Sequence, residues 1–298
     1  MAGNARGYPA DLAPKIQFLM EMADNRTERY WSLPGIKLHG YEIGTGLPLI
    51  MLHGITSNGR GWDPVADRLS HRFRGIELDQ RGHGKSGKPK GDCYGRDDFA
   101  GDVAGVIELL DAGPAIVAGH SLGARNALAL GAARPELVSA VIAIEFTPFI
   151  EVTTLDSMDA RVKGGDREFS SLEEIRSYLS KRYPLMPPDA IERRTQFGYR
   201  EADDGGYRPQ ADGAAMAATS MRLREDIETA LKEISVPTLL IRGALSKFVS
   251  VAAFGRACAL RPDLPSVTVA HADHYVPEVR PTEIARLIFE FAAENHLI

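Results

Sequence analysis

Short apolar runs alternate with helical patterns along most of the chain. Uninterrupted apolar runs, such as Pro48 to Gly54, are typical of strands that are covered on both faces. The hydrophobic pattern predicts strands at 36–43, 48–54, 73–78, 114–119, 138–144, 236–242 and 266–270, and helices at 10–23, 99–110, 122–133 and 281–292. Strands that alternate with helices predict an α/β fold with a mostly parallel central sheet flanked by helices.

One stretch departs from this alternation. Between residues 147 and 233 the pattern is helical, broken by turns such as Gly205-Gly206, and it contains no convincing strand. We interpret residues 148–233 as a helical cap, or lid, inserted into a core formed by 1–147 and 234–298. Such a cap is expected over the sheet edge where ligands bind in open α/β sheets.

Composition narrows the class of protein. The 298 residues are 44% hydrophobic and 25% charged, which predicts a sizeable core, and 35 basic against 40 acidic residues leave a net charge of −5. That balance gives no basis for nucleic acid binding. No apolar run is long enough to span a membrane, and the N-terminus lacks the apolar segment of a secretory signal. Cys93 and Cys258 are far apart, so we expect reduced thiols and a cytoplasmic protein.

The strongest motif for chemistry is Gly119-His-Ser-Leu-Gly123, a G-x-S-x-G pattern between a predicted strand and a predicted helix. A sharp turn in that context raises the Ser121 hydroxyl above the sheet, at the start of the helix, as a nucleophile requires. The alternative is an ordinary tight turn in a doubly wound sheet. The strand–turn–helix context favours the nucleophile.

An earlier strand ends in His53-Gly54-Ile55. In a fold with this nucleophile turn, the loop there supplies one backbone N–H to an oxyanion hole, and the residue after the nucleophile supplies the other. This predicts the amides of Ile55 and Leu122 as donors; the alternative is a plain strand-to-loop turn.

A general base is expected late in the chain, where Ala270-His-Ala-Asp-His-Tyr275 offers His271 and His274. We favour His274, because it lies in the loop beyond the last strand, whereas His271 is a strand-end residue. No combination of His, Cys and carboxylates has metal-ligand spacing, and we expect neither a metal nor a cofactor.

The acid of a Ser–His–acid triad is not where this fold usually places it. After the strand at 236–242 the chain has Lys247, whose cation opposes an imidazolium. Either the site is inactive or the acid lies elsewhere. Glu145 ends the strand at 138–144, at the same edge as Ser121, and we predict it as the acid; the alternative is a residue that merely closes the strand.

These motifs together resemble the α/β-hydrolase superfamily along nearly the whole chain. The matching residues are His53-Gly54, Asp79-Gln-Arg-Gly-His-Gly84, Gly119 to Gly123 and His274. The resemblance implies an α/β-hydrolase fold with the helical cap after the sixth strand, which is 138–144 here. It also implies that the turn at Asp79 is structural.

A narrower resemblance is to the (E)-2-(acetamidomethylene)succinate hydrolases of vitamin B6 degradation. It is carried by segments in the cap and the C-terminal half, including Tyr178-Leu-Ser-Lys-Arg-Tyr-Pro184, Arg242-Gly-Ala-Leu-Ser-Lys-Phe-Val-Ser250 and Ala272-Asp-His-Tyr-Val276. That family has Ser-Lys at 246–247 too, and its acid, an Asp, follows the sixth strand. The resemblance implies that Arg161 and Arg182 bind the two substrate carboxylates, with Tyr183 and Tyr275 as hydrogen-bond partners.

The sequence therefore predicts a serine hydrolase that cleaves the amide bond of a small anionic dicarboxylate through an acyl-enzyme. One alternative is a carboxylesterase or lactonase with the same triad, acting on a neutral ester. Another is a non-catalytic small-molecule receptor on the same fold. Whether copies of the chain form a homo-oligomer is left open by the sequence.

Overall fold

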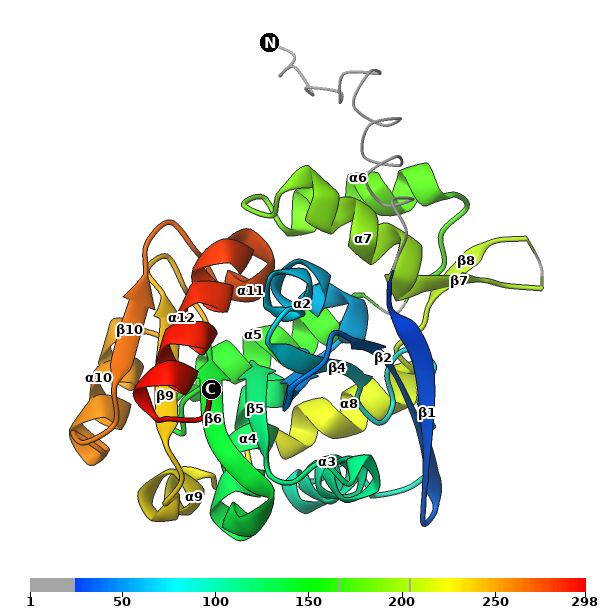
Figure 1. Ribbon diagram of the computed structural model, residues 1–298. Helices are drawn as coiled ribbons and strands as arrows, with labels where there is room; N and C mark the ends of the chain where they lie inside the picture. Colours follow the sequence, from blue (N-terminus) through cyan, green and yellow to red (C-terminus); the bar gives the residue numbers. More distant parts are fainter. Residues whose placement is uncertain (1–24, 166, 204) are drawn as a thin grey trace.

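The computed structural model describes residues 25–298 except 166 and 204 (Figure 1). The helix predicted at 10–23 lies outside these residues. The centre of the fold is a sheet of eight strands in the order β1-β2-β4-β3-β5-β6-β9-β10. The strands are β1 Thr27–Leu33, β2 Ile36–Ile43, β3 Leu47–Leu52, β4 Phe73–Asp79, β5 Ala115–His120, β6 Val138–Ile144, β9 Thr238–Gly243 and β10 Ser266–Val269.

The sheet is parallel from β4 to β10, and only β1 and β2 run antiparallel to their neighbours. The predicted mostly parallel sheet is therefore confirmed. Strand β1 was not predicted, because five of its seven residues, Thr27 to Tyr30 and Ser32, are exposed on an edge strand and form no apolar run.

Helices cover both faces of the sheet, which is why β3, β5 and β6 are almost wholly buried and apolar (Figure 1). Helices α2 and α12 pack on one face, in a cluster that includes Trp62 and Phe291. Helices α3, α4 and α10 pack on the other, in a cluster that includes Leu128 and Val106. Their bounds are α2 Asp63–Leu69, α3 Arg96–Leu110, α4 Leu122–Ala133, α10 Val251–Leu260 and α12 Pro281–Glu294, with short helices η1 Gly59–Trp62, η2 Pro135–Leu137 and α11 Val276–Val279.

Between β6 and β9 the chain leaves the sheet, and the segment is mainly helical. It contains α5 Val152–Lys163, α6 Leu172–Arg182, α7 Pro188–Gly198, β7 Tyr199–Glu201, β8 Tyr207–Pro209, α8 Gly213–Arg222 and α9 Glu228–Glu233. The expectation that this stretch contains no strand was wrong, because β7 and β8 form an antiparallel pair. Strands of three residues are too short for a period-two pattern to be recognised.

The inserted segment has a small apolar cluster of its own. Phe169, Ile175, Leu179 and Ile191 are buried together there, and Tyr275 of the core packs against them. The last helix behaves differently: Leu231 of α9 is buried in the same cluster as α4. Of the predicted cap, α6 and α7 thus form a separate layer (Figure 1), whereas α9 is packed against the core.

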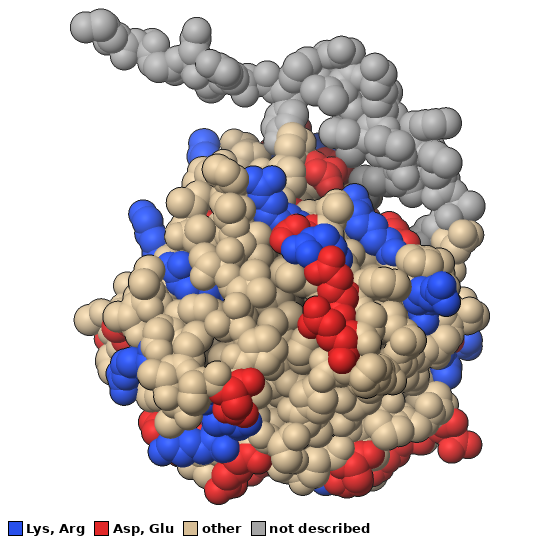
Figure 2. Space-filling view, turned by 60° about the vertical axis from the view of Figure 1, so that its left-hand side comes forward, with Lys and Arg blue, Asp and Glu red and all other residues tan. Residues whose placement is uncertain are grey.

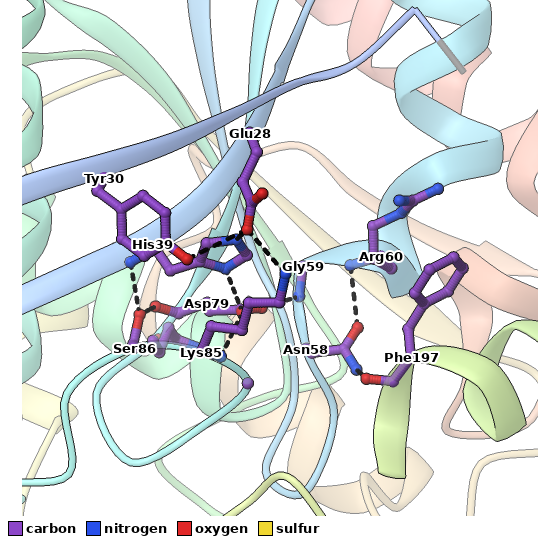
Figure 3. A network of polar contacts seen from close by, with 12 residues as sticks. Glu28, Tyr30, His39, Asn58, Gly59, Arg60, Asp79, Lys85, Ser86 and Phe197 are labelled. Atoms are coloured by element: carbon purple, nitrogen blue, oxygen red, sulfur yellow. Dashed lines mark hydrogen bonds and ion pairs between the residues drawn. The ribbon is translucent and has the colours of Figure 1, made fainter. Parts of the chain in front are cut away.

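The turn after β4 is held by the Asp79 carboxylate (Figure 3). It accepts hydrogen bonds from the Gly59 amide at 2.7 Å and the Lys85 amide at 3.0 Å, and it contacts His39 Nδ1 at 2.7 Å. Gly84 has φ +48°, and a Cβ there would lie 1.9 Å from Asp79 Oδ2, so only glycine fits. The contacts of the Asp79 carboxylate thus hold two loops in place, so its role is structural.

Candidate active site

Ser121 lies at a strained turn between β5 and α4, with φ 53° and ψ −113°. The turn is tight enough to exclude side chains at both flanking positions. A Cβ on Gly119 would lie 2.2 Å from the carbonyl of Gly123, and a Cβ on Gly123 would lie 2.2 Å from the Leu52 carbonyl oxygen. Strain of this kind is concentrated at functional sites, and here it places the hydroxyl at the carboxyl edge of the sheet.

A chain of hydrogen bonds joins three of the predicted residues. The Ser121 hydroxyl lies 3.1 Å from His274 Nε2, and His274 Nδ1 lies 3.0 Å from Glu145 Oε2. They come from the β5–α4 turn, the β10–α11 loop and the end of β6. With Nδ1–H donating to the carboxylate, Nε2 is free to accept the serine proton. His271, the rejected candidate, is exposed.

Glu145 is fully buried and is held by the end of β9. The Gly243 amide donates to Oε1 at 2.6 Å, and the Ser246 hydroxyl donates to Oε2 at 2.6 Å. Lys247, which occupies the usual place of the acid, is exposed at the rim of the cavity above. Burial raises the pKa of Glu145 to about 7, opposed by the hydrogen bonds from Ser246 and Gly243 and by the charge of Arg242.

The imidazole of His274 is neutral in this setting. Burial lowers the pKa of His274 to about 3; Asp273 opposes that change, while Arg161 and Arg194 reinforce it. A neutral imidazole can accept the proton of Ser121. Protonation of Nε2 is then stabilised by the adjacent Glu145 carboxylate.

The two predicted oxyanion donors lie beside Ser121. Leu122 follows Ser121 at the first position of α4, and Gly54 is so close that a Cβ on it would lie 3.4 Å from Ser121 Cβ. Within the described residues, the amides of Ile55 and Leu122 have no hydrogen-bond acceptor. An amide without a partner beside Ser121 is available to a substrate oxygen.

His53 has a structural role that sequence reasoning did not assign. Its Nδ1 donates to the Gly54 carbonyl at 2.8 Å, and its Nε2 accepts from the Gln80 amide at 3.1 Å. Both ring nitrogens are therefore occupied by backbone, and burial lowers the pKa of His53, which keeps it neutral. The imidazole fixes the loop that presents the Ile55 amide.

A cavity of about 420 Å³ lies over Ser121 and His274. Arg161, Arg182, Tyr183 and Tyr275, the four residues expected to bind substrate, all line it. Lys247 and Arg194 line it as well, and Asp273 is the one carboxylate residue among the described lining residues. The cavity therefore has a strong excess of positive charge.

Lys247 and two of the arginines have no carboxylate partner among the described residues. Arg182 donates to the hydroxyls of Tyr183 at 3.1 Å and Tyr178 at 2.9 Å, and to the backbone carbonyl of Arg161 at 2.8 Å. The Arg161 guanidinium is exposed and forms no ion pair there. Guanidinium groups suit planar carboxylates, so this part of the cavity is fitted for an anion.

Arg194 was missed by sequence reasoning. Its guanidinium forms two hydrogen bonds with the Glu278 carboxylate, at 2.8 and 2.6 Å, and lies 4.7 Å from the Tyr183 ring and 5.2 Å from the Tyr275 ring. Because Arg194 is on α7 and Glu278 on α11, no spacing in the sequence connects them. The pair joins the inserted segment to the helix that follows His274.

The described part of the chain contains no group of three His, Cys, Asp or Glu side chains that could hold a metal ion. None of its helices is long and apolar enough to cross a membrane.

Fold and site together define a hydrolase of the α/β type. Residues 49–287 match the Alpha/beta hydrolase family, and the chain belongs to that family. It is 45% identical to the 2-(acetamidomethylene)succinate hydrolase of Mesorhizobium japonicum over 269 residues, which are 90% of this chain and 96% of that protein.

Two other similarities agree with this. The crystal structure of an E-2-(acetamidomethylene)succinate hydrolase superposes with a TM-score of 0.87 at 45% identity, covering 90% of this chain and 99% of that one. The (E)-2-((N-methylformamido)methylene)succinate hydrolase of Acinetobacter baylyi is 31% identical over 41% of this chain and 43% of its own length. Both named compounds are N-acylated aminomethylene derivatives of succinate.

Proposed function

We propose that this chain is a serine hydrolase that cleaves the acyl–nitrogen bond of a small dicarboxylate such as (E)-2-(acetamidomethylene)succinate. One observation supports this above all: the hydrogen-bonded Ser121, His274 and Glu145 lie beneath a cavity with two guanidinium groups that lack a carboxylate partner. The 45% identity with a hydrolase of that compound agrees with the proposal.

In the proposed reaction, His274 Nε2 takes the proton of Ser121 while the hydroxyl oxygen attacks the acyl carbonyl. The amides of Ile55 and Leu122 stabilise the oxyanion, and one such donor typically contributes about 3 to 4 kcal/mol to lowering the barrier. The tetrahedral species collapses, and the nitrogen leaves with the proton held by His274. Water, activated by the same imidazole, then releases the acid from Ser121.

For (E)-2-(acetamidomethylene)succinate the acid is acetate and the leaving group is an enamine. The free enamine reacts with a second water molecule and loses ammonia and carbon dioxide, which leaves succinic semialdehyde. The protein has to catalyse only the first cleavage, and the instability of the enamine makes that cleavage irreversible.

Arg161 and Arg182 are the proposed carboxylate ligands. Tyr183 accepts a hydrogen bond from Arg182, so its own hydroxyl hydrogen can donate to the substrate. Tyr275 lies next to His274 and packs at 4.7 Å against the Tyr183 ring, which gives a second hydroxyl on the same side. We place the reaction in the cytoplasm, consistent with the free thiols Cys93 and Cys258.

The test is steady-state turnover of (E)-2-(acetamidomethylene)succinate beside neutral p-nitrophenyl acetate, with wild type and Ser121→Ala. We expect turnover that depends on Ser121 and favours the dicarboxylate by about 10²-fold or more in kcat/KM, as buried charge pairing implies. Activity on the neutral ester alone would instead indicate an esterase. No turnover and no labelling by a fluorophosphonate probe would indicate a receptor.

A further inference from the structure

The segment after β9 encloses the carboxylate of Glu145 although it carries no acid itself. Ser246 lies in this segment, and its hydroxyl is only 2.6 Å from Glu145 Oε2. The amides of Phe248 and Val249 donate to the same hydroxyl oxygen, at 3.2 and 3.1 Å. The Ser246 side chain is thus surrounded by three polar partners in a buried setting.

These partners decide where the hydroxyl hydrogen points. A serine hydroxyl has one hydrogen to donate and two lone pairs to accept with. Two amides fill both lone pairs of Ser246, so its hydrogen can only be directed at Glu145. A hydrogen bond of this kind favours the ionised carboxylate, since a protonated Oε2 would meet a donor that cannot turn around.

Arg242 keeps the segment in this shape. Its buried guanidinium donates to the Val249 carbonyl at 2.7 Å and to the Ser246 carbonyl at 3.2 Å. It forms no ion pair with a described carboxylate, so its charge acts on Glu145 without being neutralised nearby. The same segment places the Phe248 ring 4.4 Å from the His274 ring.

We propose that Ser246 is a positioning residue of the triad: its hydroxyl holds Glu145 ionised, with Oε2 directed at His274 Nδ1. The segment that carries the acid in most members of the fold here carries the group that holds the acid. The inference rests on the proposed function only in requiring that Ser121 is acylated with the help of His274 and Glu145.

The charges around the pair set the expected effect. Arg242 and the Gly243 amide remain to favour the anion when Ser246 is removed, and Asp273, Arg161 and Arg194 act on His274 from the other side. Loss of a hydrogen bond to a charged group corresponds to a shift of about one pKa unit or somewhat more. The pair should therefore take up its proton at a higher pH, and the site should lose activity there.

The experiment measures the rate at which a fluorophosphonate probe labels Ser121 between pH 5 and 10, in wild type, Ser246→Ala, Ser246→Thr and Ser250→Ala. Ser250 is the matched control, since its hydroxyl also bonds a glutamate, Glu151, but outside the site. We expect the acidic limb of the labelling rate of Ser246→Ala to move up by about one pH unit, so that its rate at pH 7 falls about fivefold and recovers above pH 9. Ser246→Thr, which keeps the hydroxyl, and Ser250→Ala should keep the wild-type limb.

The inference fails if the acidic limb of the labelling rate lies at the same pH in Ser246→Ala as in wild type. An unchanged rate, or a rate lowered equally at every pH, is what the loss of a purely structural residue would give. If Ser246→Ala does not fold, Ser246→Cys replaces it, and its weaker donor should give a smaller upward shift; an unshifted limb again refutes the inference. Failure of wild type to be labelled at all would refute the proposed function instead.

Discussion

Two of the three residues of the proposed triad occupy left-handed backbone conformations. Ser121 has φ 53° and Glu145 has φ 60°, and each follows directly on a buried parallel strand. The two turns are connected, because the Ser121 amide donates to the Ile144 carbonyl at 2.8 Å. The proposed nucleophile and acid are therefore positioned by adjoining strand ends and not by independent loops.

We expect Glu145→Gln to lower kcat by about 10⁴-fold with little change in KM, because an amide in place of the acid leaves the imidazole with the wrong tautomer. Steady-state kinetics on the dicarboxylate measures this. Glu136→Gln, at an exposed glutamate paired with Arg134, is the control and should turn over like wild type. Full activity of Glu145→Gln would mean that another group orients His274.

The pH dependence of kcat/KM follows from the hydrogen-bonded pair of Glu145 and His274. The pKa of Glu145 is raised from 4.5 to about 7 and that of His274 is lowered to about 3, so on acidification the first proton enters at Glu145. Either member of the pair loses its function once the pair holds that proton. We expect kcat/KM to be constant at alkaline pH and to fall tenfold per unit below about 7. A profile that stays flat to pH 5 would contradict the assignment.

Substitution of the cavity arginines should weaken binding of the dicarboxylate and leave the chemical step unchanged. Replacing Arg161 or Arg182 by Met should raise KM for the dicarboxylate by about 10- to 100-fold, since a hydrogen bond to a charged group contributes about 1.5 to 3 kcal/mol. Turnover of p-nitrophenyl acetate should change little. Lys181→Met, at the exposed neighbour of Arg182, is the matched control. Equal losses on both substrates would argue against a carboxylate-binding role.

The site residues differ in how far the sequence predicts them. Ser121 and His274 stand in local motifs, and Glu145 follows from its place at the end of a strand. Arg194 and Ser246 are significant only through contacts with residues 84 and 101 positions away in the chain. Hydrophobic periodicity and motif spacing contain no information about such pairings.

At the scale of elements, the ion pair of Arg194 and Glu278 joins α7 to α11. Both side chains are close to fully buried, with 11% and 5% exposed. Removing one partner leaves the other charge buried, so we expect Arg194→Met or Glu278→Gln to lower the free energy of unfolding by about 3 to 5 kcal/mol. Urea denaturation followed by circular dichroism measures the loss.

Two further variants test whether burial of an unpaired charge is the cause of this loss of stability. The double variant Arg194→Met with Glu278→Met removes both charges and should recover most of the loss. Arg176→Met breaks the more exposed pair with Glu192 between α6 and α7, and should cost about 1 kcal/mol or less. A double variant no more stable than either single one would show that the pair has another role.

The elements that the sequence predicts best include two that are apolar and almost wholly buried. Helix α4 and strand β6 were predicted at their observed bounds, Leu122–Ala133 and Val138–Ile144. Strands β7 and β8 were missed because each has three residues, and β1 because its edge position leaves it polar. Helix α2 was missed because its seven residues give a helical stripe only a few apolar positions.

At the scale of the whole molecule, charge is distributed unevenly between surface and cavity. The chain carries a net charge of −5, and acidic and basic side chains are interspersed on the face shown in Figure 2. The cavity, by contrast, contains Arg161, Arg182 and Lys247 without carboxylate partners among the described residues. Attraction of an anionic substrate must therefore be local to the cavity mouth.

Attraction of an anionic substrate to the cavity mouth should be sensitive to salt. The Debye length falls from about 30 Å at 0.01 M ionic strength to about 8 Å at 0.15 M. We expect kcat/KM for the dicarboxylate to decrease several-fold over that range and kcat/KM for p-nitrophenyl acetate to stay constant. Parallel titrations with NaCl decide this, and an equal response of both substrates would show that the salt acts on the protein and not on substrate attraction.

Strands β6 and β9 are hydrogen-bonded neighbours, although α5 to α8 lie between them in the sequence. Because the two strands are parallel, the chain leaves the sheet at the end of β6 and returns at its opposite edge, where α9, packed against the core, leads to the start of β9. Within the inserted segment, α6 and α7 have a buried cluster of their own, whereas α5 and α8 share one with Tyr94, Phe99 and Leu122 of the core. The α6–α7 layer is therefore the part that could be exchanged for that of another α/β hydrolase: it would replace Arg182, Tyr183 and Arg194 in the cavity and leave the strand ends and loop of the proposed triad in place.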